Sequence, residues 1–446
     1  MKKNRFKELD FIDLRPHAMS IKDKYIKLMK KFKPTLSPYE ERVYLSDNVI
    51  LSPERIGEKV SRNVLAIGQD RSGKTHYFVE PNIENAKGSL VVLDNGGHLF
   101  KKYRSRLELR GYDVSCLNLS DIKNSNFYNP LAYIEDEKDI EELTDMLLIG
   151  DDVRNPHEAS AKRSLLIAIL AFLIQHRREE DQDFCSILKL LHAEVGYGEY
   201  DETCLDMIFD EIYENNPADY SATAFKAYRK IDRETAVQIV SSLTEQMQVY
   251  ETAHDESFLR TERENYRRNI GLNILWERKT AIFIVTDVLQ PLYNNLLTIF
   301  FTQLYKALCH TKTQIVDDSK QIYSVDVILD DFDTLPRIPN LGAILDQSGS
   351  CGVGTFITVR ELEAIKRIYG KGADGILDSL STTLCMEGMS PDAIERFLKP
   401  ADVDAIKNRR SGLHTIENLA LDECVVLLKG QPPIIDKKCG IQNLQE

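Results

Sequence analysis

Residues 64–75 read Val64-Leu65-Ala66-Ile67-Gly68-Gln69-Asp70-Arg71-Ser72-Gly73-Lys74-Thr75. Four aliphatic residues lead directly into the complete pattern of a phosphate-binding loop, in which two glycines let backbone N–H groups turn toward phosphate. In such a loop we expect Lys74 to reach the β- and γ-phosphates and Thr75 to ligate Mg²⁺. The pattern predicts a nucleoside triphosphate site whose nucleotide-binding residues are Gly68, Arg71, Ser72, Gly73, Lys74 and Thr75.

A second predicted element is an acidic strand end. A site of this kind needs a carboxylate beside the Mg²⁺ and usually another that orients the attacking water. Residues 325–331 read Val-Asp-Val-Ile-Leu-Asp-Asp, and no other predicted strand ends in two acids. We therefore expect Asp330 to serve the metal ion and Asp331 to orient water. Taken alone this signal is weak, because Asp is common where strands turn into loops.

Strands and helices alternate around the loop. Residues 89–94 and 114–119 are typical of buried parallel strands, with a charged helix between them at 98–109. From about 150 to 268 the strand signal disappears, and helical stretches such as 161–175 and 222–251 dominate. Predicted strands resume at 280–286, 325–329, 355–359, 383–387 and 424–428. The order predicts an α/β domain that is interrupted by a helical insertion.

The amino-acid composition of the chain excludes several classes of protein. A chain of 446 residues with 43% hydrophobic and 28% charged residues is typical of a globular protein with two or three domains. The net charge of −13 argues against a surface that grips duplex DNA as a whole. The eight cysteines form no CxxC pair and no zinc-finger spacing, which favours a reducing cytoplasm. The most apolar run, 165–174, is short for a bilayer span, and no signal sequence is indicated.

The N-terminal region differs from the rest in charge. Residues 1–33 contain eleven Lys and Arg against four acids, so this region carries +7 and the remainder −20. Its apolar residues fall on one helical face, which predicts a basic amphipathic helix ending before Pro34. Such a helix can lie on the inner membrane surface or contact nucleic acid, or it can pack on its own domain. The sequence leaves these alternatives open.

Several further segments resemble one family, the type IV secretion coupling proteins, which are conjugative DNA-transfer ATPases of the TraG/TraD type. The resemblance covers about residues 45 to 440 in order. Some of its motifs, notably the Tyr-Asn-Pro segment, are not shared by phosphate-binding-loop enzymes at large. The matching segments are 63–68 leading into the loop, 78–82, 127–134, 279–283, 303–305, 330–332, 338–341, 368–370 and 423–430.

This resemblance implies a RecA-like motor domain with a mainly parallel central sheet and an inserted all-helical domain, assembled as a homo-hexamer around a channel. It implies ATP and Mg²⁺ as cofactors, and as partners a relaxase bound to single-stranded DNA and the channel proteins of the secretion system. The helical domain is in that family the face that meets the relaxosome. The expected domains are a basic arm at 1–44, the motor domain at 45–149 and 269–446, and the helical insert at 150–268.

The sequence departs from the family pattern at four places. Asp331 stands where the family usually has Glu, which shortens the reach toward water, and residues 94–98 retain only the first acid and one glycine of the family motif. The segment Gly349-Ser350-Cys351 aligns with the arginine-finger triplet, and such a finger is worth about 10³ to 10⁵ in rate. Arg360 replaces a sensor glutamine. These substitutions predict that ATP is bound but hydrolysed slowly.

Two roles are open for Arg360: a catalytic cation near the γ-phosphate, or a charge that pairs with Asp330 or Asp331 and holds the site inactive.

The two transmembrane helices common at the start of family members are also not found, so we expect a cytoplasmic protein or one bound peripherally at the inner face of the membrane. Three functions follow in order: a DNA-transfer coupling ATPase, a nucleotide-binding adaptor without motor activity, and a cytoplasmic translocase or helicase unconnected with secretion.

Overall fold

The computed structural model describes residues 42–51, 61–150, 155–194, 203–252, 256–261, 268–287, 291–314, 323–387, 390–398 and 419–440. The predicted basic arm lies outside these residues except for its last three positions, so its helix and its membrane contact stay predictions. Within the described ranges, no helix combines the length and the apolar character that crossing a bilayer requires.

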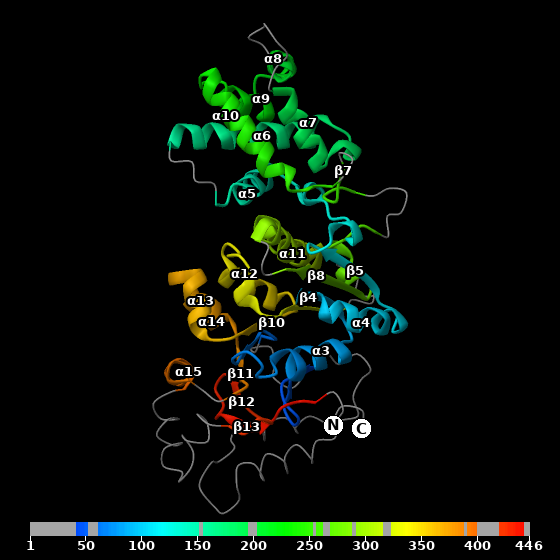
Figure 1. Cartoon of the computed structure of the whole chain (residues 1–446), viewed down its shortest axis with the longest axis vertical. Coiled ribbons are helices and arrows are strands. Elements are labelled where there is room, and N and C mark those ends of the chain that lie inside the picture. The colour runs from blue at the N-terminus through cyan, green and yellow to red at the C-terminus, as the bar shows by residue number, and fades with distance from the viewer. Residues whose placement is uncertain are drawn as a thin grey trace, which may run out of the picture.

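A nine-stranded sheet forms the centre of the molecule (Figure 1). Its strands lie in the order β13-β12-β11-β3-β10-β9-β4-β8-β5. Pairing is parallel from β11 through β5, whereas β12 and β13 are antiparallel additions at one edge. The bounds are β3 (Val64–Ile67), β4 (Ser89–Asn95), β5 (Asp113–Asn118), β8 (Thr280–Thr286), β9 (Val325–Leu329), β10 (Val353–Val359), β11 (Thr382–Cys385), β12 (Glu423–Leu428) and β13 (Ile434–Lys437). The mainly parallel sheet predicted from the sequence is confirmed.

Both faces of the sheet are covered by helices, which explains why its central strands are apolar at successive positions. Side chains alternate between the two layers: Val64 and Ala66 join one hydrophobic cluster, and Leu65 joins the other. The first cluster is completed by helices α3 and α4, and the second by α11 to α14. These helices are α3 (Glu80–Asn85), α4 (His98–Leu109), α11 (Asn294–Gln314), α12 (Leu341–Ser350), α13 (Leu362–Tyr369) and α14 (Ala373–Ser379), with α15 (Pro391–Phe397) before the C-terminal strands.

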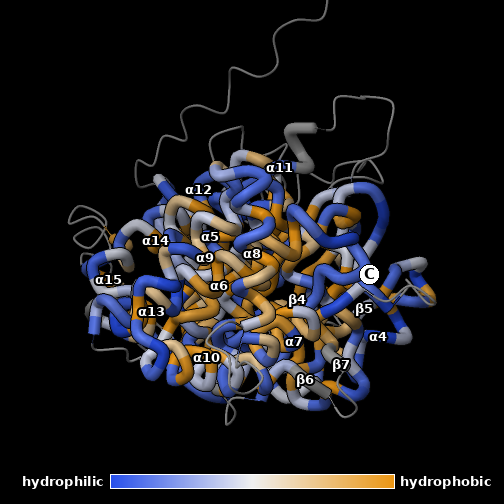
Figure 2. The backbone as a smooth tube through the Cα atoms, turned by 90° about the horizontal axis from the view of Figure 1, so that it is seen from above, coloured by the Kyte–Doolittle hydropathy of each residue, from blue (hydrophilic) through white to orange (hydrophobic). Residues whose placement is uncertain are grey.

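A bundle of helices occupies one end of the molecule, on the side away from β11, β12 and β13 (Figure 1). Its central helix α6 is buried on nearly all sides over Leu165 to Leu173, so the apolar run read from the sequence is a core helix. Figure 2 shows the hydrophobic residues gathered toward the centre and the hydrophilic ones toward the rim. The bundle consists of α5 (Glu137–Leu147), α6 (Pro156–His176), α7 (Phe184–Glu194), α8 (Cys204–Asn215), α9 (Tyr220–Tyr228) and α10 (Arg233–Gln248).

Two details differ from the predicted helical stretches. The stretch predicted at 222–251 is divided into α9 and α10, because Asp232 leaves the helical conformation and its side chain accepts the backbone N–H of Thr235. The bundle also includes a small antiparallel hairpin, formed by β6 (Glu251–Thr252) and β7 (Glu256–Ser257). Two-residue strands leave too little alternation in a sequence for this hairpin to be predicted.

The chain passes from the sheet domain to the helical bundle at Phe127 and returns at residues 268–270. The Phe127 N–H donates to the Arg268 carbonyl at 2.7 Å, and the Ile270 N–H donates to the Phe127 carbonyl at 2.7 Å. The guanidinium groups of Arg260 and Arg268 lie 5.0 and 4.5 Å from the Phe127 ring centre. The chain therefore leaves the sheet domain and returns to it at adjacent points.

The first and last described strands meet at the opposite end of the molecule. A short hairpin of β1 (Val43–Tyr44) and β2 (Ile50–Leu51) lies against β13. Asp436 on β13 accepts hydrogen bonds from the Ser46 hydroxyl at 2.7 Å and from the Asn48 backbone and side-chain amides, both at 2.8 Å. A buried carboxylate with this many donors is well satisfied, so the two segments form one structural unit.

Asn63 connects four elements at the amino end of the sheet. It is fully buried, and its amide donates to the carbonyls of Leu345 and Ser379 at 3.2 and 3.3 Å. Its carbonyl oxygen accepts the backbone N–H of Thr355 at 3.0 Å. One side chain thus links the approach to β3 with α12, α14 and β10.

We expect Asn63→Ala to lower the free energy of unfolding by about 2 to 4 kcal/mol, because three buried backbone groups lose their partner. Urea unfolding of the purified protein measures this difference. The control is Asn124→Ala, which removes an exposed hydrogen bond to Asp121 and should cost less than about 0.5 kcal/mol. Equal losses in the two variants would contradict a structural role for Asn63.

Candidate nucleotide-binding site

The loop predicted to bind phosphate lies between β3 and η1, a π-helical turn (Thr75–Val79), at the carboxyl end of the parallel strands. Arg71 and Gly73 adopt left-handed backbone conformations with φ of 68° and 91°. Gly68 begins the loop, and a Cβ there would stand 2.5 Å from the Ser72 hydroxyl, so only glycine fits. The two glycines therefore allow the tight curl that the motif predicts.

Lys74 lies across its own loop. Its ammonium group donates to the carbonyls of Gly68 at 2.6 Å and Gln69 at 3.3 Å, and the residue is 6% exposed. The Ser72 hydroxyl nearby is buried and has no hydrogen-bond partner in the part of the chain that the structure describes. A buried cation beside an unsatisfied hydroxyl and curled backbone is a suitable environment for the oxygens of a phosphate chain.

Asp330 sits between two hydroxyl groups. Thr75 Oγ1 donates to one of its carboxylate oxygens at 2.7 Å, and Thr358 Oγ1 donates to the other at 2.7 Å. Burial raises the pKa of Asp330, and these hydrogen bonds partly offset that effect. The end of β9 is thereby linked both to β10 and to the helix after the loop. A hydroxyl and one carboxylate in contact fit Mg²⁺, which takes few protein ligands and completes its shell with phosphate and water.

Asp331 follows in a left-handed conformation with φ of 51°, which is uncommon for a residue with a side chain. Its N–H donates to Thr358 Oγ1 at 2.8 Å, so one threonine hydroxyl contacts both acids. Burial and the neighbouring Asp330 raise the pKa of Asp331 to about 6. The residue whose carboxylate is expected to orient water is thus fixed at its backbone.

A row of hydrogen bonds extends this arrangement across the sheet. Thr286 at the end of β8 donates to Asn95 at 2.5 Å, and Asn95 at the end of β4 donates to the Thr334 hydroxyl at 3.0 Å. That hydroxyl in turn donates to the Asp331 carbonyl at 2.8 Å. Sequence reasoning missed Asn95, Thr286 and Thr334. Asn95 and Thr286 each end an apolar strand, which was the available signal, whereas Thr334 lies in the turn Phe332–Thr334 after β9.

Arg360 occupies the end of β10 but binds other acids than expected. Its Nε lies 2.7 Å from a carboxylate oxygen of Asp333, and its Nη1 lies 3.9 Å from Asp70. Neither ion pair involves Asp330 or Asp331, which were the expected partners if Arg360 holds the site inactive. Asp333 is 1% exposed and its second oxygen has no partner among the described residues, so the Asp333 carboxylate holds the guanidinium firmly.

The altered motif at residues 94–98 has a structural use. Asp94 is buried, and its carboxylate accepts the backbone N–H of Phe100 at 2.7 Å, which caps the first turn of α4. Gly97 precedes the helix with φ of 73°. The acid retained from the family pattern therefore fixes α4. Desolvation raises the pKa of Asp94 despite this contact.

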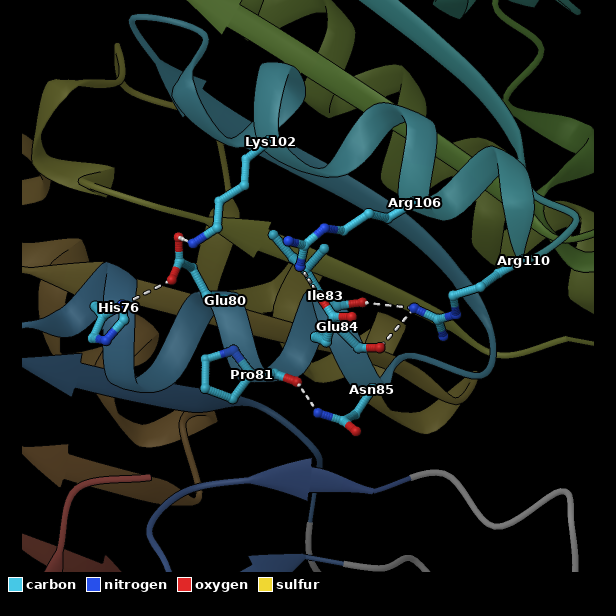
Figure 3. A network of polar contacts seen from close by, with 9 residues as sticks. All are labelled: His76, Glu80, Pro81, Ile83, Glu84, Asn85, Lys102, Arg106 and Arg110. Carbon is cyan, nitrogen blue, oxygen red and sulfur yellow. Dashed lines mark hydrogen bonds and ion pairs between the residues drawn. The ribbon is translucent and has the colours of Figure 1, made fainter. Parts of the chain in front are cut away.

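Ion pairs join α4 to the helix that follows the loop (Figure 3). Glu80 binds Lys102 at 2.5 Å and His76 at 2.9 Å, and Arg106 binds Glu84 at 3.2 Å. Glu80 is largely buried, whereas its partners are half exposed. The helix beginning at Thr75 is thereby held against α4 as well as against the sheet.

The segment aligned with the arginine finger lies at the amino end of the parallel strands, opposite to the phosphate-binding loop. Gly349 packs against Ser61, and a Cβ at Gly349 would stand 2.9 Å from the Ser61 hydroxyl. Ser61 precedes β3, whereas the phosphate-binding loop follows β3. The length of this strand therefore separates the loop of the same chain from Gly349-Ser350-Cys351. The segment contains no cation.

We expect Asp331→Asn to increase the free energy of unfolding more at pH 8 than at pH 5. The folded-state pKa is raised to about 6 from the ordinary 3.8, so wild-type stability falls as pH rises through this range. Asn avoids the cost of ionisation, and its advantage should grow by about 1 kcal/mol between the two pH values. Urea unfolding at both values measures it, with the exposed Asp346→Asn as control. A gain that does not change with pH would refute this assignment.

Comparisons with known proteins support the fold. The bacterial conjugative coupling protein TrwBdeltaN70 matches with a TM-score of 0.55 and 14% identity, over 94% of this chain and 92% of that one. TrwB in complex with the ATP analogue ADPNP matches with a TM-score of 0.56 and 13% identity, covering 92% and 91%. VirB4 of Thermoanaerobacter pseudethanolicus matches with a TM-score of 0.51 and 10% identity, covering 92% and 99%. The RecA-like fold is confirmed.

No curated protein matches the chain. A family model described as type IV secretory system conjugative DNA transfer matches residues 27–399, which is most of its length. This match agrees with the motifs that surround the loop and with the sheet that carries them. The chain belongs to the type IV secretory system conjugative DNA transfer family.

Proposed function

We propose that this protein is an ATP-binding coupling protein, which recruits relaxase-bound single-stranded DNA to the channel of a type IV secretion system. The observation that most directly supports this proposal is the hydrogen bond from Thr75 to Asp330 beside the buried Lys74, in a chain that belongs to this family. TrwB, which shares the fold, has been solved with ADPNP and with ADP and Mg²⁺. Family membership also favours this function over a translocase or helicase unconnected with secretion.

Each residue of the site has a proposed role. Lys74 exchanges its two carbonyl contacts for phosphate oxygens, and the Ser72 hydroxyl gains a partner. Thr75 and Asp330 hold the metal ion, and Asp331 orients the attacking water. Gly68 and Gly73 shape the loop, and Arg71 borders it. Bound Mg²⁺-ATP supplies the phosphoanhydride bond whose hydrolysis drives transport.

Slow hydrolysis is part of the proposal. Asp331 is one methylene shorter than Glu and is fixed at its backbone by Thr358, so its carboxylate has little freedom to approach a water molecule. Arg360 is bound to Asp333, and leaving that buried carboxylate unpaired would be costly. The segment at the finger position supplies no cation. If nothing compensates, the protein is a nucleotide-binding adaptor without motor activity, which is the second candidate.

The helical bundle is the proposed surface for the relaxosome. Its outermost helix α8 exposes Asp210, Glu211 and Glu214 on one face, which suits a basic partner. Asp206 on the same helix pairs with Arg229 at 2.8 Å and belongs to the interior. Glu202, the next acid before this helix in the sequence, lies outside the described residues. The assignment of residues 150–268 as the partner-binding domain stays a prediction, as do the homo-hexamer and the contacts with channel proteins.

ATP turnover in the presence of single-stranded DNA should lie well below 1 per second, the lower end of the ordinary range for phosphoryl transfer, which is about 1 to 100 per second. We expect Asp331→Glu to raise it by about tenfold, because the longer side chain reaches the water. A coupled phosphate-release assay measures turnover, and Asp346→Glu is the exposed control.

A wild-type rate in the ordinary range that Lys74→Ala abolishes would refute impaired hydrolysis. Nucleotide binding without turnover in both wild type and Asp331→Glu would favour the adaptor.

For the N-terminal arm we propose peripheral attachment to the inner face of the membrane. Residues 1–33 carry +7, and each basic residue near an anionic surface contributes about 1 kcal/mol. Flotation with vesicles containing phosphatidylserine at low salt should recover the full chain, but not the chain lacking residues 1–34. Neutral phosphatidylcholine vesicles are the control. Equal recovery of both chains would rule out this role of the arm.

A further inference from the structure

Lys438 is a buried cation whose partners are carbonyl groups. Its ammonium group donates to the carbonyl of Ser72 in the phosphate-binding loop at 2.9 Å and to that of Leu421 at 2.8 Å. The residue is 7% exposed, and burial lowers the pKa of its amine. No ion pair joins Lys438 to a carboxylate of the described ranges. Sequence motifs gave no reason to select it.

A buried ammonium group that contacts no carboxylate directly is costly, and the more distant charges of Glu387 and Asp422 offset its burial only in part, because the pKa of the amine stays lowered. A purely structural link between β13 and the loop would need only a neutral donor. Phosphate in the loop, on the other side of the Ser72 carbonyl, would bring a further negative charge near Lys438.

The geometry of one peptide group connects the cation to that phosphate. The Ser72 carbonyl and the Gly73 N–H belong to the same peptide bond, which is trans, so the two groups point in opposite directions. With the carbonyl directed outward to Lys438, the N–H is directed away from it, toward the concave side of the loop. A charge-assisted hydrogen bond to the carbonyl polarises the peptide and strengthens its N–H as a donor.

Other contacts hold the same outer side of the loop. A Cβ on Gly73 would stand 2.4 Å from the Tyr77 ring, and Lys438 Nζ lies 5.7 Å from the centre of that ring. The Gln69 N–H lies 3.2 Å from a carboxylate oxygen of Glu387, directly after β11. The back of the loop is thus held by Glu387 after β11 and by Lys438 after β13, neither of which the phosphate-binding motif includes.

We propose that Lys438 is a positioning residue of the nucleotide site, a second cation that fixes the Ser72–Gly73 peptide from behind and raises the affinity for the phosphate chain. The inference rests on the proposed binding of nucleotide. It assigns a part of the site to the C-terminal strands, two residues from Asp436, which anchors the β1–β2 hairpin. The nucleotide site and the first described strands are therefore connected through one short segment.

The test uses the full chain and the Mg²⁺ complex of the fluorescent nucleotide N-methylanthraniloyl-ADP. We expect Lys438→Met to raise the dissociation constant by about tenfold, because a charge-assisted contact is lost, and Lys438→Arg to restore it to within about threefold. Lys437→Met is the matched control. Its ammonium group is exposed and pairs with Asp422 at 3.2 Å, so its affinity should equal that of wild type.

Thermal unfolding without nucleotide separates a binding role from a structural one. A Lys438→Met variant that is less stable but binds the nucleotide with wild-type affinity would overturn the proposal, and so would a Lys438→Arg variant that binds as weakly as Lys438→Met. If Lys438→Met does not fold, Lys438→Gln keeps an N–H donor without the charge, and the same two outcomes apply to it. Wild-type protein that binds no nucleotide would instead refute the proposed function. Binding that Lys74→Ala abolishes and Lys438→Met leaves unchanged refutes only the inference.

Discussion

The buried carboxylate of Asp330 is the point on which the arrangement of the site depends. Its two oxygens are taken by Thr75 and Thr358, so the ends of the neighbouring strands β9 and β10 and the start of the helix after the loop are held at hydrogen-bond distance. Removing any of these partners would leave a polar group unsatisfied in a place that excludes water. The conformation of Asp331 and the row through Thr334 and Asn95 follow from this fixed centre.

Much of this could be predicted from sequence, because the responsible signals are local. The curl of the loop depends on glycines at fixed positions, and the central strands are apolar at successive positions because both faces of the sheet are covered. The end of β9 was identifiable because two acids follow four aliphatics. Each of these features is determined within fewer than ten residues, and a single chain is enough to recognise them.

The remainder depends on contacts between residues far apart in the chain. The pairing of Arg360 with Asp333 was missed because three acids within four residues are equivalent in sequence, and only the turn after β9 decides which one faces β10. Lys438 reaches Ser72 across 366 positions, and it lies beyond the last segment that matches the family. The changes at residues 94–98 were interpreted only as lost chemistry, yet the Asp94 carboxylate and the Gly97 backbone begin α4.

The paired points at which the chain enters and leaves the helical bundle have a consequence for how this protein can change over time. Entry and exit are paired by backbone hydrogen bonds at Phe127, Arg268 and Ile270, and main-chain bonds form with almost any side chain. Substitutions on the far helices therefore need not disturb the strands that carry the loop. A chain built in this way can change the outer surface of its bundle while the strands that carry the phosphate-binding loop keep their sequence, so the two parts can evolve at different rates.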